Sequence, residues 1–383
     1  MTLRSLAPVL TFRLPPAVAA FAAAAIALAP AASFGGPGFL ETTRRHITLT
    51  STISDNGDLN PYAIVVAPVS SGTVQAGDVL IDNFNNANNL QGTGSTIVDY
   101  NPSTKRQFTF ARLPSQLPGC PGGVGLTTAM TMLKSGWVIV GSAPSTDGTT
   151  GTLGDGCLVV LDSSGKVAGV IKSDKISAPW GNMAVIDRGD SATLFLSNSG
   201  FGVGAPDRER TIYKKATVLR IELSIPAGGV PVVQSETVIA DGLSERAARD
   251  VFLVGPTGLA LGTDGKTLYV SDALNNRVIA IDDAPTRGAS AGNGREITKD
   301  GLLRRPLAMI LAPNGNLLIT NGKTGQVVEV DPLSRRQLYA QWIDTDKAQT
   351  PAGNGDLFGI AATPNGDGFY YVEDDMNTLV LAK

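Results

Sequence analysis

Histidine is almost absent from this chain of 383 residues, which contains a single copy, His46. Catalysis by a Ser-His-Asp arrangement needs a base beside the nucleophile, so the sequence argues against that class of hydrolase. Histidine-assisted lactonases and lyases, and zinc or copper sites built on imidazole, are disfavoured for the same reason.

An excess of positive charge is also missing. The chain carries 31 Lys and Arg against 34 Asp and Glu, which gives a formal net charge of −3. Nucleic-acid-binding domains usually show a basic surface, so we predict no nucleic-acid partner.

Apolar runs long enough to span a membrane are missing as well. Residues 17–28 form an apolar run that follows Arg4 and Arg13 and precedes the small residues 29–31. This run is shorter than the roughly 20 residues that a transmembrane helix needs, and the pattern is typical of a secretory signal peptide. We therefore predict a signal peptide over residues 1–33, cleaved or retained as an anchor, and no transmembrane segment after cleavage. The mature chain is expected in the periplasm or outside the cell.

Cysteine is rare, with Cys120 and Cys157 as the two copies. In an exported chain an even pair predicts a disulfide, and two buried free thiols are the alternative. The Cys-x-x-Cys spacings of redox and zinc motifs do not occur.

Glycine and proline are abundant, with 44 Gly and 23 Pro in a chain that is 43% hydrophobic. This mix predicts many short strands joined by tight turns. One hairpin pattern recurs: an apolar strand, a Gly-containing turn and a second apolar strand that ends in polar residues. Its six copies begin at Pro61, Leu126, Asn182, Pro256, Pro306 and Gly359.

Each copy continues into a third strand and usually a fourth, and such units of about 50 residues are the blades of a β-propeller. We therefore predict an all-β, six-bladed β-propeller with four-stranded antiparallel blades, in one domain over residues 34–383. The sixth copy ends after its third strand, so the ring lacks an outer strand. Residues 46–53 alternate polar and apolar side chains, and we expect them to supply that strand and close the ring.

The fourth copy carries a family resemblance. Residues 265–278 read Gly-Lys-Thr-Leu-Tyr-Val-Ser-Asp-Ala-Leu-Asn-Asn-Arg-Val. This segment resembles an NHL repeat, whose pattern is a Gly turn, Tyr-Val, an Asp and then Asn-x-Arg. Asp272 and Arg277 match the Asp and the Arg of that pattern. The resemblance implies a propeller, but no activity, because proteins of this family range from binding modules to enzymes.

Loop lengths predict which face of the propeller is used. The connections between second and third strands are short in the last three blades and long in the first three, at residues 83–94, 142–156 and 199–215. The inter-blade segments 114–125, 243–255 and 344–357 extend the same face. Function concentrates in long loops on a rigid scaffold. We therefore predict that this face binds a partner protein, a glycan or a small ligand.

Candidate ligand-binding residues lie on this face. The amides of Asn83, Asn85 and Asn86 could bind a sugar or a cation, or could instead satisfy the backbone of their own loop. Trp180 is a candidate stacking platform, with packing inside a blade as the alternative.

A distant similarity to propellers of the SMP-30 and gluconolactonase type supplies an alternative function, a Ca²⁺-dependent lactonase-like hydrolase. Enzymes of that type hold Ca²⁺ with Glu, Asn and Asp side chains in the channel. The comparable strand-end residues here are Asn60, Asn182, Asn198, Asp272, Asn321 and Asp374. Their oxygen atoms suit Ca²⁺, the one cofactor that the sequence suggests, although each residue could instead cap a turn. The Glu of the first blade is absent, because Asp58-Leu59-Asn60-Pro61 stands there. No catalytic residue is assigned, and whether the chain is an enzyme stays open.

Overall fold

The computed structural model describes Met1, residues 38–204 and residues 211–383. The predicted signal peptide, apart from Met1, therefore lies outside the described residues. Within the described part of the chain, no helix is both long and apolar enough to cross a bilayer.

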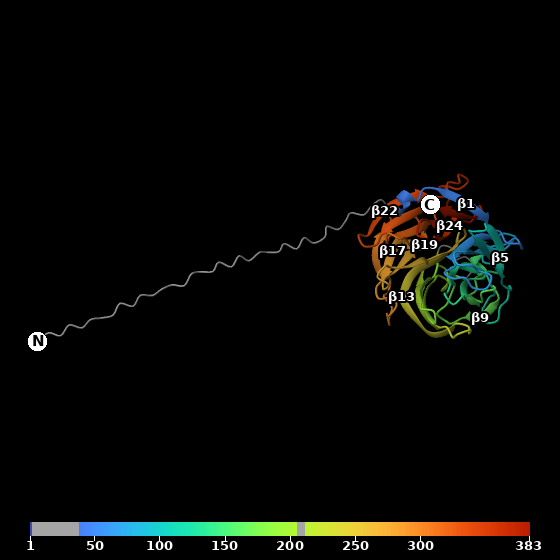
Figure 1. The fold of residues 1–383 in the computed structure, drawn as a ribbon, viewed down its shortest axis with the longest axis horizontal. Helices are drawn as coiled ribbons and strands as arrows, with labels where there is room; N and C mark the ends of the chain where they lie inside the picture. Colours follow the sequence, from blue (N-terminus) through green and yellow to red (C-terminus); the bar gives the residue numbers. More distant parts are fainter. Residues whose placement is uncertain (2–37, 205–210) are drawn as a thin grey trace. The chain divides into compact units, whose positions relative to one another are not determined.

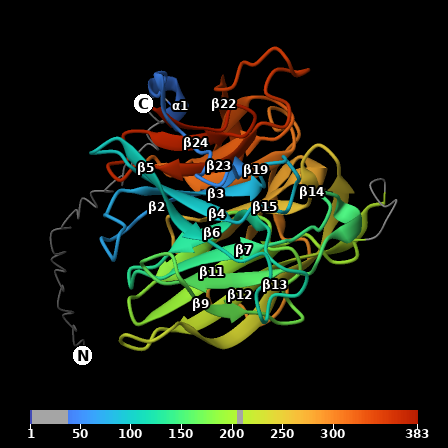
Figure 2. The same cartoon turned by 90° about the vertical axis from the view of Figure 1, so that its right-hand side faces the viewer.

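Six antiparallel sheets follow one another around a ring (Figure 1). Blade 1 consists of β2 (Leu59–Val66), β3 (Val79–Asn85), β4 (Thr96–Asn101) and β5 (Arg106–Arg112). Blade 2 consists of β6 (Leu126–Met132), β7 (Val138–Ser142), β8 (Cys157–Leu161) and β9 (Val167–Ile171). Blade 3 consists of β10 (Ala184–Asp187), β11 (Ser191–Asn198), β12 (Tyr213–Ser224), β13 (Val232–Ala248) and β14 (Phe252–Val254). Blade 4 consists of β15 (Pro256–Leu261), β16 (Leu268–Asp272), β17 (Arg277–Ile281) and β18 (Arg295–Lys299). Blade 5 consists of β19 (Pro306–Leu311), β20 (Leu317–Asn321), β21 (Gln326–Asp331) and β22 (Arg336–Trp342). Blade 6 contains β23 (Leu357–Ala362), β24 (Phe369–Glu373) and β25 (Thr378–Ala382). The six-bladed propeller predicted from the repeats is confirmed, and Figure 2 shows the strands of the first three blades lying side by side.

The ring closes through the N-terminal part of the chain. Strand β1 (His46–Ser51) pairs antiparallel with β25, from His46 opposite Ala382 to Ser51 opposite Thr378. It thereby forms the outer strand of blade 6, and Figure 1 shows it beside β24 and the C-terminus. The predicted closing strand is confirmed.

A single helical turn before this strand is tied to blade 5. It is α1 (Phe39–Thr42), and the other helical elements described are the 3₁₀ turns η1 (Thr150–Thr152) and η2 (Ala273–Asn275). The buried carboxylate of Glu329 on β21 accepts hydrogen bonds from the backbone N–H groups of Phe39, at 2.9 Å, and Leu40, at 3.0 Å. The side chain of Leu40 is fully buried, so the N-terminal segment is part of the packed structure.

Hydroxyl groups at the ends of second strands tie blades to their neighbours. Ser197 Oγ donates to the carbonyl of Thr257 at 3.0 Å, and Thr320 Oγ1 donates to that of Phe358 at 2.9 Å. Ser271 makes the same bond to Leu307. These bonds hold the second strands of blades 3, 4 and 5 against the inner strands of blades 4, 5 and 6.

Blade 1 has a carboxyl group where these blades have a hydroxyl. Asp82 Oδ1 accepts a hydrogen bond from the N–H of Ala63 at 2.7 Å, while Oδ2 is buried without a partner. Burial raises the pKa of Asp82 well above its usual range. A raised pKa favours the neutral form of this carboxyl group, which suits its buried position between the blades.

Blade 3 differs from the sequence-based expectation. Residues 243–255 were expected to be an inter-blade loop, but β13 runs through Ala248 and turns back into β14, with Ala248 paired to Phe252. The apolar character of Ala247, Val251 and Phe252 explains the difference, because this hairpin buries all three side chains.

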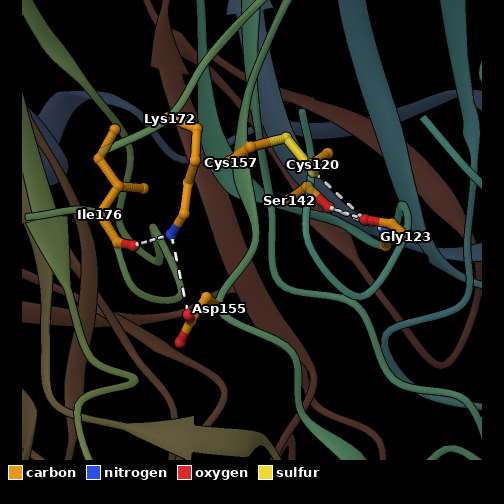
Figure 3. The surroundings of a disulfide bond; sticks show 8 residues. Cys120, Gly123, Ser142, Asp155, Cys157, Lys172 and Ile176 are labelled. Carbon is orange, nitrogen blue, oxygen red and sulfur yellow. Dashed lines mark hydrogen bonds and ion pairs between the residues drawn. A yellow bond between two sulfur atoms is a disulfide. The ribbon is translucent and has the colours of Figure 1, made fainter. Parts of the chain in front are cut away.

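The predicted disulfide is confirmed. Cys120, in the segment that enters blade 2, is bonded to Cys157 at the start of β8 (Figure 3). Nearby, Ser142 Oγ donates to the carbonyl of Gly123 at 3.4 Å, and Lys172 Nζ donates to that of Ile176 at 2.6 Å. The bond therefore fastens an inter-blade segment to the end of a long loop of the same face.

Removing this bond is expected to destabilise the protein. The two cysteines are 37 positions apart, and constraining a loop of this size lowers the entropy of the unfolded chain. The Cys120→Ala/Cys157→Ala variant should therefore lose about 2–4 kcal/mol of unfolding free energy in guanidinium titrations. Reductant should lower the stability of the unmodified protein to a similar value and leave the variant unchanged. A loss below about 1 kcal/mol would contradict the expected role of the bond.

Candidate functional site

The axis of the ring is filled by aromatic side chains at the loop-bearing end. They are Tyr62, Phe84, Trp180, Phe252 and Phe358, each at most 2% exposed. The apolar cluster around them draws residues from all six blades, which places it on the axis. The axis is therefore closed at this level by a packed apolar core.

The aromatic side chains of this cluster contact one another directly. The ring of Tyr62 is stacked between Phe358, at 3.9 Å between centroids, and Phe84, at 4.3 Å. Trp180, the candidate stacking platform, meets Phe84 edge-on at 5.5 Å and stacks on Phe252 at 6.0 Å. Its indole faces other side chains of the cluster and is 1% exposed.

The asparagines of the first long loop mostly hold that loop. Asn83 Nδ2 donates to the carbonyl of Thr52 at 3.0 Å, and Asn85 Nδ2 donates to Asn89 Oδ1 at 2.6 Å. Asn86 Oδ1 accepts from the backbone N–H of Asn88 at 3.0 Å. Asn83 and Asn85 are buried, and each keeps an Oδ1 without a partner.

Asn182 is a bridge between blades. Its Oδ1 accepts from the N–H groups of Leu259, at 3.3 Å, and Met309, at 3.1 Å. Its Nδ2 donates to the carbonyls of the same two residues at 2.9 and 3.0 Å. One amide thus joins the inner strands of blades 4 and 5 to blade 3.

Three other members of the predicted metal set cap turns. Asn198 Oδ1 accepts from the N–H of Ser177 at 3.2 Å. Asp272 Oδ2 accepts from Arg277 Nε at 2.7 Å, and Asn321 Oδ1 accepts from the N–H of Arg304 at 2.9 Å. In each case the strand-end oxygen holds the backbone or side chain of a neighbouring segment.

The remaining two members lie near the junction of blades 6 and 1. Asn60 has a left-handed φ of 67°, and its N–H donates to Asn377 Oδ1 at 2.7 Å. Asp374 is the member that lies beside other carboxylates, since its N–H donates to the carbonyl of Asp356 at 3.0 Å and Asp375 follows it. The structure therefore brings Asp374 into an acidic group and leaves Asn60 Oδ1 buried without a partner. The side-chain oxygens of the other four residues have hydrogen-bond partners elsewhere.

That acidic group contains three carboxylates that converge on the loop-bearing face. Asp344 follows β22, Asp356 precedes β23 and Asp375 follows β24, and one carboxylate oxygen from each lies within 4.8 Å of the others. We call these three residues the blade 5–6 carboxylates. The sequence-based argument named Asp374 but missed these three, although the pairs Asp344-x-Asp346 and Asp374-Asp375 were a signal.

Burial and mutual repulsion act on these groups. Burial, together with the charges of Asp375 and Asp344, raises the pKa of Asp356 to about 7. Burial also raises the pKa of Glu373 to about 7, and the pKa values of Asp374 and Asp375 lie above their usual range for the same reason. Among the described residues, no Lys or Arg forms an ion pair with them.

A basic pocket lies elsewhere on the same face. Its volume is about 170 Å³, and its lining includes Arg246, Arg304, Arg305 and Lys323. Arg305 is buried and paired with Asp250 at 2.7 Å, whereas Arg304 and Lys323 are exposed. Several positive charges around a small hollow form a site that suits an anionic group.

Comparison with known sequences gives a limited result. No protein-family model matches the chain. The protein SUPPRESSOR OF QUENCHING 1, chloroplastic, of Arabidopsis thaliana is 24% identical over 152 residues, which are 36% of this chain and 14% of that protein. The chain therefore matches about a seventh of that relative's length.

Comparison with solved structures confirms the fold. A gluconolactonase of Xanthomonas campestris superposes with a TM-score of 0.55 at 12% identity, covering 90% of this chain and 91% of that one. A glucose dehydrogenase-like oxidoreductase of Thermus thermophilus gives 0.54 at 13% identity, with 88% and 99% covered. The calcium-binding protein regucalcin of Agrobacterium tumefaciens gives 0.50 at 11%, with 88% and 92% covered. At these identities the likeness is one of fold.

Proposed function

We propose that the protein is an exported, non-catalytic binding propeller whose loop-bearing face takes up an anionic group of its ligand. The ligand is a partner protein, a glycan or a small molecule that carries a carboxylate or a phosphate. The observation that carries this proposal is the basic pocket, where Arg304 and Lys323 are exposed beside Arg246. Such groups attract anions at long range and bind them through charge-assisted hydrogen bonds.

The closed axis favours binding over the alternative, a Ca²⁺-dependent lactonase-like hydrolase. An enzyme of that type needs an open channel in which a metal and a substrate meet. Here Tyr62, Trp180 and Phe358 fill the axis, each at most 2% exposed. The oxygen atoms of Asn182 and Asp272, which the alternative requires, already accept hydrogen bonds within the fold.

Two observations support export. Cys120 and Cys157 form a disulfide, and such bonds persist mainly in oxidising compartments. The segment over residues 1–33 has the charge and hydropathy pattern of a signal peptide.

Anion binding is tested by titrating the protein with citrate and with inorganic phosphate in a low-salt buffer that contains chelator. We expect calorimetric heat that weakens as salt is added, because added ions screen charges at an exposed site. Arg304→Glu/Lys323→Glu should weaken binding about tenfold or more, since it reverses two of the attracting charges.

The matched control reverses two charges on the opposite face. Lys105, in the turn between β4 and β5, and Arg106, the first residue of β5, are both exposed, and Lys105→Glu/Arg106→Glu should leave the affinity unchanged. Equal affinities in both double variants, or no heat with either anion, would contradict the proposal. Gluconolactone hydrolysis that depends on added Ca²⁺ would favour the alternative instead.

A further inference from the structure

The blade 5–6 carboxylates are more than a solvated acidic surface. Asp344 and Asp356 are only 5% and 6% exposed, and the Oδ2 atom of each is buried without a hydrogen-bond partner. Buried polar atoms in proteins are almost always hydrogen-bonded, so two such oxygens at one place indicate that something binds there.

Uncharged oxygen atoms in the same connection point to the same conclusion. Gln349 Nε2 donates to Asp375 Oδ2 at 3.3 Å, which places the Gln349 amide at the carboxylates, and its Oε1 is buried without a partner. Asn354 Oδ1, in the same connection, is also buried and unpartnered. The place is therefore rich in oxygen acceptors and poor in donors.

The backbone holds these groups in fixed positions. The N–H of Gly325 donates to the carbonyl of Ala352 at 2.8 Å, and the N–H of Asp344 donates to the carbonyl of Gly325 at 3.0 Å. A Cβ atom on Gly353 would lie 2.4 Å from the Cα of Gly325, so the connection packs too closely for any other residue there. The carboxylates are thus brought together by the folded backbone, and the cost of assembling the site is met during folding.

We propose that Asp344, Asp356 and Asp375, together with the amide oxygen of Gln349, bind one Ca²⁺ ion at the junction of blades 5 and 6. The donor set consists of oxygen alone, which suits a hard cation and disfavours zinc or copper. Mixed carboxylate and amide oxygens on a loop are typical of Ca²⁺, whereas Mg²⁺ demands stricter octahedral geometry and retains its waters. The site differs from the channel set of strand-end residues.

The ion has a structural consequence for the ring. It joins the segment that leaves blade 5 to the start of β23 and to the turn between β24 and β25 in blade 6, which is the blade that β1 closes. Two positive charges at this place offset the repulsion among Asp344, Asp356 and Asp375. Ca²⁺ should therefore stabilise the protein as well as bind to it.

The experiment uses the full chain, stripped of metal with chelator and titrated with CaCl₂. We expect calorimetric binding with a Kd of roughly 10⁻⁴ to 10⁻³ M, as in other extracellular Ca²⁺ modules. The melting temperature should rise by about 2–5 °C at about 10 mM Ca²⁺ and much less with Mg²⁺. No binding heat together with no change in melting temperature would overturn the proposal.

Asp356→Asn gives a readout that a purely structural role would not produce. Without Ca²⁺ this variant should melt above the unmodified protein, because it removes one repelling charge from the group. With Ca²⁺ it should show no further rise, because a ligand is lost. Asp174→Asn, at an exposed position away from the site, is the matched control and should behave as the unmodified protein does. An Asp356→Asn variant that binds Ca²⁺ with an unchanged Kd would contradict the assignment.

Terbium locates the site independently of that variant. Tb³⁺ replaces Ca²⁺ at oxygen sites and emits when a nearby tryptophan is excited. Trp342 precedes Asp344 by two residues, so the two Cα atoms lie within about 7 Å. Trp342→Phe should remove most of the emission and leave the Ca²⁺ heat unchanged, and Asp375→Asn should reduce both. Full emission in both variants would place the ion elsewhere and overturn the proposal. Anion binding at the basic pocket is measured with chelator present and therefore without Ca²⁺. A failure of the Ca²⁺ proposal can thus be told apart from a failure of the anion proposal.

Discussion

Replacing Trp180 with alanine should lower the free energy of unfolding by about 4–5 kcal/mol, near the upper end for a buried aromatic residue. The indole is 1% exposed and meets the rings of Tyr62, Phe84 and Phe252 within 6.0 Å. Its removal leaves a cavity on the axis. The surrounding rings come from different blades, so they cannot move into this cavity without breaking the hydrogen bonds that hydroxyl groups make between neighbouring blades. Each aromatic pair also contributes about 0.5–1.5 kcal/mol beyond its buried area.

Trp342→Ala is the matched control for this effect. Trp342 ends β22 and is 45% exposed, so its loss should cost about 1 kcal/mol or less. Both variants are compared with the unmodified protein by guanidinium titration, with the slope of each transition checked for change. Equal costs for the two tryptophans would show that the aromatic cluster does not hold the axis together, and would also remove the argument that the axis is closed to ligands.

The fold could be predicted because its signal is local and repeated. An apolar strand, a Gly turn and a polar strand end occur close together in the chain, so each copy is visible without knowledge of the others. The closing strand was also visible, since residues 46–53 alternate polar and apolar side chains and the sixth copy lacks an outer strand. The hairpin of β13 and β14 was missed because its apolar residues, such as Phe252, are buried in the axial cluster that all six blades share, and only the ring brings that cluster together.

The site was harder to predict because its parts come from separate segments. Asp344, Asp356 and Asp375 follow or precede three different strands, and only the ring geometry brings them together. The strand-end set was chosen by residue type at comparable places, and some of its oxygen atoms serve as caps there: Asp272 holds Arg277, and Asn321 holds the N–H of Arg304. Residue type alone does not tell an oxygen that caps a turn from an oxygen that is free to bind an ion.

Deleting the N-terminal segment through Ile53 is expected to have the largest effect of all. The truncated chain loses every backbone hydrogen bond between β1 and β25, and β25 becomes an open edge. It also loses the buried side chain of Leu40 and exposes Glu329, whose carboxylate would no longer receive two backbone N–H groups. With about 1.5–3 kcal/mol for the buried side chain and about 1 kcal/mol for each hydrogen bond, the loss should be about 5 kcal/mol or more.

A chain that begins at Gly38 is the matched control for this truncation, because it keeps α1 and β1. It should give the same melting temperature as the mature protein, while the longer truncation should aggregate or unfold at a much lower temperature.

A synthetic peptide of residues 38–53 offers the decisive comparison. Added in trans, it can pair with the open edge of β25 as a donated strand, and it should restore both solubility and the melting transition. A Thr48→Pro peptide cannot donate at the centre of the ladder, where Thr48 lies opposite Val380, and should restore neither. If the truncated chain melted like the control without any peptide, ring closure by β1 would contribute little, and blade 6 would have to be stable as a three-stranded sheet.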